Sequence, residues 1–127
     1  MLRILVVDDC PDTATSLQWL TQAWGHAARI ATDGPTALTM ADSFQPDIML
    51  LDINLPRMDG YEVAKRLREV DPQRPIIIAF SGYCTGDDIR RALDAGCNCY
   101  LAKPTEPEEI KQLLEAYEQL LIRTKEP

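Results

Sequence analysis

Five short, mostly apolar runs constrain the fold of this chain more than any other feature. The three strongest are Leu2–Val7, Asp47–Leu51 and Ile76–Phe80, and the two weaker ones are Ala27–Ala31 and Cys97–Ala102. Apolar runs of this length without polar alternation are typical of strands that are buried on both faces of a parallel sheet. The sequence therefore predicts five strands in a sheet that other elements cover on both sides.

Each predicted strand is followed by a segment with helical signals. Pro11 stands where the first residue of a helix is expected, because its missing N–H has no helical partner there. Asp59 with Glu62, and Thr85 with Asp88, have the spacing of residues that cap a helix amino terminus. Strands that alternate with helices and pair in parallel form a doubly wound α/β sandwich. We therefore predict a five-stranded parallel sheet with five helices.

The last predicted helix is the longest one. Thr105 and Glu108 have capping spacing at its start, and an apolar stripe follows. The stripe consists of Ile110, Leu113, Leu114, Tyr117, Leu120 and Leu121. The 127 residues suit a single compact domain. We predict that domain over residues 1–122, followed by a frayed tail over residues 123–127.

Charge and composition exclude several classes of function. The net charge of −7 repels nucleic acid and anionic lipid, which argues against direct contact with either. No apolar run approaches the roughly 20 residues that a membrane helix needs, and the first ten residues do not resemble a signal peptide. The four cysteines lack zinc-site spacing. Reduced thiols in a cytoplasmic protein are therefore expected.

Polar side chains follow four of the five predicted strands, at the point where each strand ends. Asp8 and Asp9 follow the first strand, Asp52 the third, Ser81 the fourth and Lys103 the fifth. The carboxyl ends of parallel strands meet at one edge of a doubly wound sheet, which is where such folds bind ligands. Any one of the three aspartates could simply cap a helix, but three aspartates, a serine and a lysine together at one edge predict a site.

Three carboxylates at that edge require a cation. Two carboxylates repel each other by roughly 4 kcal/mol at 4 Å with an effective dielectric constant of 20, and Lys103 compensates only one of them. Ligands that are all oxygen favour Mg²⁺, which also binds substrate phosphate. With the metal present, Asp52 could attack phosphorus and form an aspartyl-phosphate. Lys103 would neutralise the transferring group, and Ser81 would donate to one of its oxygens.

In combination, the motifs of this chain resemble one protein family. They are Val6-Val7-Asp8-Asp9, Leu50-Leu51-Asp52-Ile53-Asn54-Leu55-Pro56, Met58-Asp59-Gly60, Ala79-Phe80-Ser81-Gly82, Ala95-Gly96 and Lys103-Pro104. This set and order resemble the receiver domains of bacterial two-component response regulators, including the free-standing chemotaxis regulator. The resemblance covers the chain from about residue 2 to residue 121. It implies a flavodoxin-like fold with strand order 2-1-3-4-5.

The resemblance also implies a role for each acidic residue. Asp52 would be the phosphoacceptor. Asp9 and Asp52 would bind Mg²⁺ directly, Asp8 would act mostly through water, and the backbone carbonyl of Asn54 would complete the protein ligands. Mn²⁺ is expected to substitute for Mg²⁺. Asn54 and Tyr83 would tune the lifetime of the aspartyl-phosphate by admitting or blocking water.

The switch and its partners follow from the same resemblance. Ser81 would be the switch hydroxyl, Tyr100 the switch aromatic residue, and Lys103–Pro104 a cis peptide. The donor would be a sensor histidine kinase or a histidine phosphotransfer protein. The fourth helix, fifth strand and fifth helix would present a face to a downstream protein, and dimerisation on phosphorylation stays open. Such a domain is not an enzyme beyond promoting its own phosphorylation and dephosphorylation.

Two other functions remain as alternatives. A Mg²⁺-dependent phosphatase with an aspartyl-phosphate intermediate usually has an acid two residues after its nucleophile, and here that position holds Asn54. A flavodoxin-like cofactor binder would have a loop rich in Ser, Thr and Gly after the first strand, where this chain has Asp8 and Asp9. The sequence favours the signalling receiver over both.

Several conspicuous residues are predicted to be structural. His26, the only histidine, is expected to be a solvated turn residue rather than a phosphate carrier. Trp24 is expected in the core, whereas Trp19 lies off the apolar stripe of its helix and marks a candidate contact surface. Arg90 and Arg91 are expected on a solvated helix face.

Overall fold

The computed structural model describes residues 1–82 and 85–125 of the chain. Within these ranges, strands and helices alternate from end to end. They are β1 (Arg3–Val7), α1 (Pro11–Ala23), β2 (Ala27–Ala31), α2 (Gly34–Phe44), β3 (Ile48–Asp52), α3 (Gly60–Val70), β4 (Ile76–Ser81), α4 (Gly86–Ala95), β5 (Cys99–Ala102) and α5 (Pro107–Lys125). The predicted alternation of five strands with five helices is confirmed.

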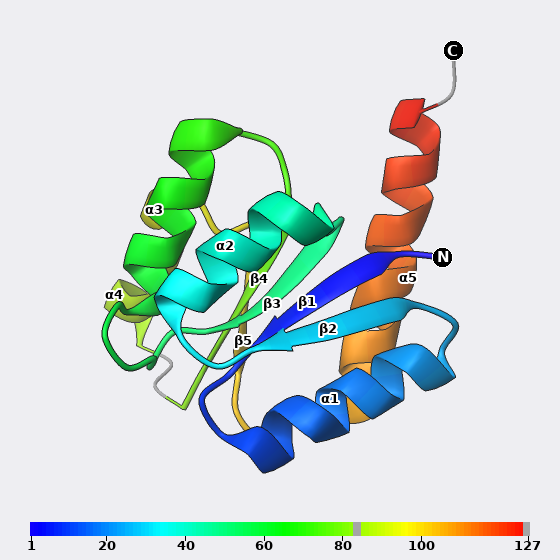
Figure 1. The fold of residues 1–127 in the computed structure, drawn as a ribbon, viewed down its shortest axis with the longest axis horizontal. Helices are drawn as coiled ribbons and strands as arrows, with labels where there is room; N and C mark the ends of the chain where they lie inside the picture. The colour runs from blue at the N-terminus through cyan, green and yellow to red at the C-terminus, as the bar shows by residue number, and fades with distance from the viewer. Residues whose placement is uncertain (83–84, 126–127) are drawn as a thin grey trace.

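The five strands form one parallel sheet with the order β2-β1-β3-β4-β5, as expected. Helices α1 and α5 cover one face of the sheet, and α2, α3 and α4 cover the other (Figure 1). This arrangement is the flavodoxin-like doubly wound sandwich. No helix among the described residues is both long and apolar enough to cross a membrane.

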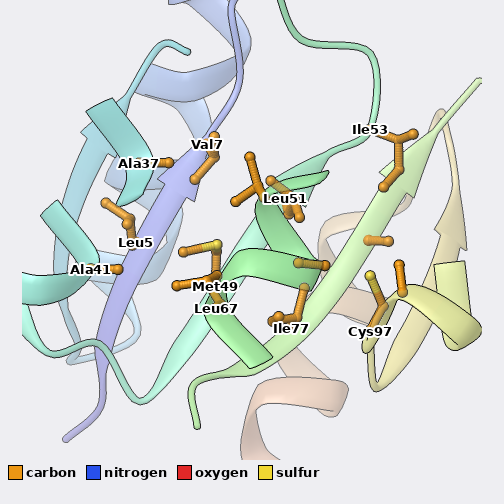
Figure 2. Packing of buried hydrophobic residues seen from close by; sticks show 14 of the residues in the cluster. Leu5, Val7, Ala37, Ala41, Met49, Leu51, Ile53, Leu67, Ile77 and Cys97 are labelled. Carbon is orange, nitrogen blue, oxygen red and sulfur yellow. The ribbon is translucent and has the colours of Figure 1, made fainter. Parts of the chain in front are cut away.

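Alternate residues of the central strands supply two separate hydrophobic cores. Leu5 and Val7 of β1 face α2 and α3, and they pack with Met49 and Leu51 of β3 (Figure 2). The residues between them on β1 and β3 face α1 and α5. Residues of a strand point alternately to opposite faces, so a strand buried on both faces is apolar throughout. This is why the three central strands appear in the sequence as unbroken runs.

The helix starts that the sequence predicts are mostly present. The Asp59 carboxylate accepts from the Glu62 N–H at 3.0 Å, and Thr85 and Asp88 form a reciprocal capping box at the start of α4. Thr105 is different, because its hydroxyl donates to the Ala102 carbonyl at 2.7 Å and α5 begins two residues later. Each satisfied cap is worth about 1 kcal/mol.

Helix α5 differs from the predicted pattern in two ways. Leu120, expected on its apolar stripe, is 50% exposed. Helix α5 continues to Lys125, three residues past the predicted domain end at residue 122. The next helix-breaking residue in the chain is Pro127, so the backbone can remain helical where the sequence suggested fraying.

The prediction for His26 is wrong. Its side chain is buried, with 9% exposure, and its Nδ1 accepts a hydrogen bond from the Leu2 N–H at 3.0 Å. The N–H of Leu2 precedes β1 and needs an acceptor once it is buried. His26 meets that need, so it links the entry of β1 to the entry of β2 and is a structural residue.

The pH dependence of stability should reflect this histidine. Burial lowers the pKa of His26 below its ordinary value of 6.5, although the nearby Glu118 acts in the opposite direction. As the pH falls below 6.5, the unfolded chain therefore takes up a proton that the folded chain resists, and the free energy of unfolding decreases. One such group contributes a slope of at most about 1.4 kcal/mol per pH unit.

Urea unfolding of the natural chain and of His26→Asn at pH 7.5, 6.5 and 5.5 measures this contribution. Asn offers an oxygen acceptor in place of Nδ1 and does not titrate. The variant should therefore lose less stability than the natural chain between pH 6.5 and 5.5. Equal losses in the two chains would show that His26 does not contribute to acid sensitivity.

Candidate functional site

The carboxyl edge of the sheet gathers the acidic residues that the sequence places there. Asp8 and Asp9 follow β1 directly, and Asp52 is the last residue of β3. One carboxylate oxygen from each of the three lies within 4.8 Å of the other two. Asp8 and Asp52 are buried, whereas Asp9 is exposed. The structure therefore brings together all three predicted metal-ligand side chains in one cluster, open to solvent at Asp9.

Lys103 bridges the two buried carboxylates of this cluster. Its Nζ donates to Asp8 Oδ2 at 3.1 Å and to Asp52 Oδ2 at 3.2 Å, and its side chain is 34% exposed. Burial acts to lower the pKa of Lys103, but the carboxylates of Asp52 and Asp8 outweigh it and raise the pKa above the ordinary value of 10.5. Lys103 is therefore a firmly held cation at the centre of the site.

Asp52 is held by two donors on different sides. Its Oδ1 accepts from the Asn54 N–H at 3.0 Å, and its Oδ2 accepts from Lys103. Burial raises the pKa of Asp52 above 3.8, and the charge of Asp8 adds to this effect, while the hydrogen bond from Asn54 and the charge of Lys103 oppose it. The two donors orient the ionised carboxylate, but its burial beside Asp8 costs free energy. A nearby cation would therefore stabilise the ionised form.

Two hydrogen bonds hold Asp8 in place, one at its carboxylate and one at its backbone N–H. Its Oδ1 accepts from the Cys10 N–H at 2.9 Å, and its own N–H donates to the Ala31 carbonyl of β2 at 3.1 Å. Asp9, the next residue, has an exposed side chain. With one ammonium among three carboxylates, the formal charge of this described cluster is negative by two. Oxygen donors with unbalanced negative charge fit a hard divalent cation such as Mg²⁺.

The two predicted switch residues lie on β4 and β5, the strands next to β3 on its far side from β1. Ser81 ends β4, is buried, and accepts the Lys103 N–H at its backbone carbonyl at 2.8 Å. Tyr100 lies three residues before Lys103 on β5 and packs, half-buried, against the core on the α3 and α4 side. The Lys103–Pro104 peptide is cis, as the family resemblance predicts. Tyr83, expected to tune the phosphate lifetime, lies outside the described residues, as does Cys84.

Gly60 is a site residue whose role sequence reasoning missed. Its N–H donates to the Ile53 carbonyl at 2.9 Å. A Cβ at position 60 would lie 2.7 Å from the Ile53 Cα and 2.9 Å from the Asp52 backbone oxygen. Only glycine lets the start of α3 approach the end of β3 this closely. The Asp59-Gly60 pair predicts a turn, but only the fold shows that Gly60 packs directly against the backbone of Ile53 and Asp52.

Arg91 is exposed, as expected for a residue on a solvated helix face. Its guanidinium carbon also lies 4.2 Å from the centroid of the Tyr61 ring, a contact that the sequence did not predict. This cation–π contact joins α4 to the first turn of α3. Burial raises the pKa of Tyr61, with smaller effects from Asp88 and Tyr100. Arg91 therefore connects α4 to the helix turn of α3 that begins at Gly60.

The sequence of this chain is similar to that of known proteins. The family model described as the response regulator receiver domain matches residues 4–115. The response regulator MprA of Mycobacterium avium is 39% identical over 124 residues, which cover 98% of this chain and 53% of that protein. This chain thus spans about half the length of MprA. An uncharacterised 14.6 kDa protein of Leptolyngbya boryana is 35% identical over 117 residues, which cover 91% of this chain and 89% of that protein.

Solved structures agree with the sequence comparisons. The chemotaxis protein CheY4 of Vibrio cholerae superposes with a TM-score of 0.86 and 25% identity, over 92% of this chain and 98% of that one. A putative response regulator of Chloroflexus aurantiacus superposes with a TM-score of 0.84 and 30% identity, over 91% of this chain and 96% of that one. The matched range covers most of the chain and includes the positions of Asp8, Asp9 and Asp52. The chain therefore belongs to the receiver domain family of two-component response regulators.

Proposed function

We propose that this receiver domain is a phosphorylation-dependent switch that accepts a phosphoryl group on Asp52. The observation that carries the proposal is the cluster of Asp8, Asp9 and Asp52 around Lys103. A buried carboxylate held by two donors, beside a fixed ammonium and an exposed acidic group, has the parts that phosphoryl transfer needs. The function is signalling, and the chain acts catalytically only on its own phosphoryl group.

Each residue of the site would have its own role in the transfer. Asp8, Asp9, Asp52 and the backbone carbonyl of Asn54 would hold Mg²⁺, with Asp8 acting mostly through water. When bound, the metal supplies charge neutralisation at the phosphoryl oxygens. The Asp52 carboxylate attacks phosphorus, and the donor leaves with the electrons of the broken bond. The Lys103 ammonium, which now pairs with the Asp52 carboxylate, would then pair with a phosphoryl oxygen.

The response would begin at Ser81 and Tyr100. The new group adds roughly −1.5 to −2 charge and three acceptor oxygens, and the Ser81 hydroxyl would donate to one of them. Tyr100 would turn further into the core, and α4 would shift with it. Only Ala92 and Ala95 of α4 are buried, so few apolar contacts oppose such a movement. The α4-β5-α5 face would then change its affinity for a downstream protein.

The donor would be a sensor histidine kinase or a histidine phosphotransfer protein in the cytoplasm. The relatives named as response regulators support this class of partner. The acidic surface argues against direct contact with nucleic acid or membrane. No structural observation favours dimerisation on phosphorylation. None favours the phosphatase alternative either, since Asn54 stands where that class usually has an acid.

Incubation with Mg²⁺ and acetyl phosphate separates the switch from the phosphatase. Intact-mass spectrometry should show one added phosphoryl group per chain, lost on treatment with mild base. A phosphatase would instead release inorganic phosphate over many turnovers without accumulating a modified chain. Sustained turnover, or no modification under these conditions, would contradict the proposed function.

Magnesium should stabilise the folded chain measurably. A ligand that binds only the folded state adds about 2.7 kcal/mol at a hundredfold excess over its dissociation constant. The melting temperature should therefore rise by several degrees on adding MgCl₂ and return on adding EDTA, and MnCl₂ should act similarly.

Asp9→Asn and Asp12→Asn form a matched pair for this experiment. Both side chains are exposed and both changes remove one negative charge, but only Asp9 belongs to the cluster. Asp9→Asn should lose most of the stabilisation by Mg²⁺, and Asp12→Asn should retain it. Equal losses in the two variants would indicate non-specific screening by the salt rather than a metal site.

A further inference from the structure

An apolar cavity lies beside the phosphoacceptor site, between α1 and α5. Its volume is about 410 Å³. Its apolar walls come from Leu17 of α1, Phe80 of β4, Ile110 of α5, and Pro104 in the segment between β5 and α5. Phe80 and Ile110 are buried core residues, so this wall is firmly placed. The cavity is large enough for a small apolar group, and its apolar walls have no role in the proposed phosphoryl transfer.

Two contacts connect the cavity to Asp52. Lys103 lines the cavity, and its Nζ is 3.2 Å from Asp52 Oδ2. Phe80 is the register partner of Asp52 in the sheet, and its carbonyl accepts from the Ile53 N–H at 3.0 Å. The cavity therefore opens within the length of one side chain from the carboxylate that would attack phosphorus.

We infer that this cavity binds the acyl group of a small acyl phosphate, so that the chain is phosphorylated faster by donors with longer apolar acyl groups. The inference rests on the proposed function, because it assigns a donor subsite to that same carboxylate. It concerns donors of the acyl phosphate class, in which an apolar chain is joined through a carboxyl group to the phosphate.

The transfer step is balanced without any further reactant. An oxygen of the ionised Asp52 forms a bond to phosphorus, and the bond between phosphorus and the acyl oxygen breaks. The acyl group leaves as a carboxylate with the electron pair of that bond. One anionic carboxylate is consumed and one is released, so no proton has to be supplied.

Charge and polarity favour an acyl group over other occupants. None of the residues that line the cavity is acidic, and its one charged residue is Lys103. A departing carboxylate would therefore develop next to an ammonium, while its chain lies on Leu17 and Ile110. A second cavity, of about 580 Å³, lies at the amino edge of the sheet, where Asp42, Asp47 and Asp71 line it together with Arg3 and Arg74. It lies at the opposite edge of the sheet from Asp52, and its three carboxylates would repel a departing carboxylate.

The test compares acetyl, propionyl and butyryl phosphate at equal, subsaturating concentrations with Mg²⁺. Burying one methylene accelerates the reaction by up to about fourfold, so butyryl phosphate should label the chain roughly tenfold faster than acetyl phosphate. The spontaneous hydrolysis of each donor is measured without protein and subtracted. Equal labelling rates for the three donors would overturn the inference and leave the proposed function intact. Failure of all three to label the chain would overturn both.

A matched pair of variants on α1 locates the effect. Leu17→Gln places a polar group in the cavity wall, whereas Leu20→Gln makes the same change on the same helix outside that wall. Leu17→Gln should reduce the preference for butyryl phosphate to about twofold or less, and Leu20→Gln should keep it. A preference that survives Leu17→Gln would overturn the assignment to this cavity. Labelling by acetyl phosphate reports in each case that the variant is folded.

Discussion

Asp52→Asn is expected to abolish phosphorylation and, in magnesium-free buffer, to raise the free energy of unfolding. The loss follows because an amide is not a nucleophile towards phosphorus at neutral pH. The gain follows because the Asp52 side chain is only 6% exposed and carries a charge beside Asp8. Asn has nearly the same shape and can still accept the hydrogen bond that the Asn54 N–H donates to Oδ1. One substitution should therefore remove function and add stability.

The sign of the stability change follows from the pKa of Asp52. Burial raises that pKa above 3.8, so the folded chain holds the proton more firmly than the unfolded chain does. Ionisation of Asp52 therefore lowers the free energy of unfolding as the pH rises from the unfolded-state pKa through the folded-state pKa, and the cost is complete above the folded-state pKa. Below about pH 3.8 the group is protonated in both states, and the advantage of Asn should disappear.

Urea titrations of both chains at pH 7.5 and at progressively lower pH, all with EDTA, measure this difference. The midpoint of Asp52→Asn should exceed that of the natural chain at pH 7.5, and the two should converge as the pH falls. Adding Mg²⁺ should stabilise the natural chain more than the variant. A variant that is less stable at pH 7.5 without metal would show that the bond to Lys103 outweighs the burial cost.

Gly60→Ala is expected to destabilise the fold by about 1–3 kcal/mol, the usual cost of forcing extra volume into a packed region. The added Cβ would meet backbone atoms of Ile53 and Asp52 at 2.7 and 2.9 Å. No side-chain rotation can relieve contacts with backbone, so the end of β3 must shift. Because Asp52 lies at that end, labelling by acetyl phosphate should also slow, by an amount that reports the displacement of the carboxylate.

Gly86→Ala is the matched control for this change. Gly86 is also the first residue of a helix, and a Cβ there meets nothing within 4 Å. That substitution should leave stability unchanged or raise it by about 0.4–1 kcal/mol, since Ala restricts the unfolded chain. Chemical denaturation of both variants and of the natural chain measures the two changes in the free energy of unfolding. Similar stabilities would show that β3 accommodates the extra carbon at position 60 without cost.

The convergence of the acidic residues is predictable from sequence because it depends only on where strands end. Asp8, Asp52 and Lys103 each follow an apolar run, and parallel pairing places the ends of such runs together. No long-range geometry has to be known beyond the direction of the strands. The strand order itself needed the family resemblance, since periodicity identifies strands but not their neighbours.

The residues that sequence reasoning missed act through contacts between distant segments. His26 accepts from Leu2 across 24 positions, and nothing near His26 in the sequence shows that this N–H needs an acceptor. Arg68 donates to the Gly96 and Pro75 carbonyls and to the Asn98 side chain, which joins α3 to the starts of β4 and β5. An arginine on an amphipathic helix gives no local signal of such a role. Tertiary packing alone decides it.

Locating the phosphoryl group by peptide mass spectrometry, after borohydride reduction of the acyl phosphate, tests the assignment of the site most directly. The chain is labelled with acetyl phosphate in the presence of Mg²⁺, and a parallel sample contains EDTA. Reduction should mark Asp52 and no other residue, and only in the sample with metal. A mark on another residue, or equal labelling of Asp52 in EDTA, would contradict the assignment of Asp52 as the metal-dependent phosphoacceptor.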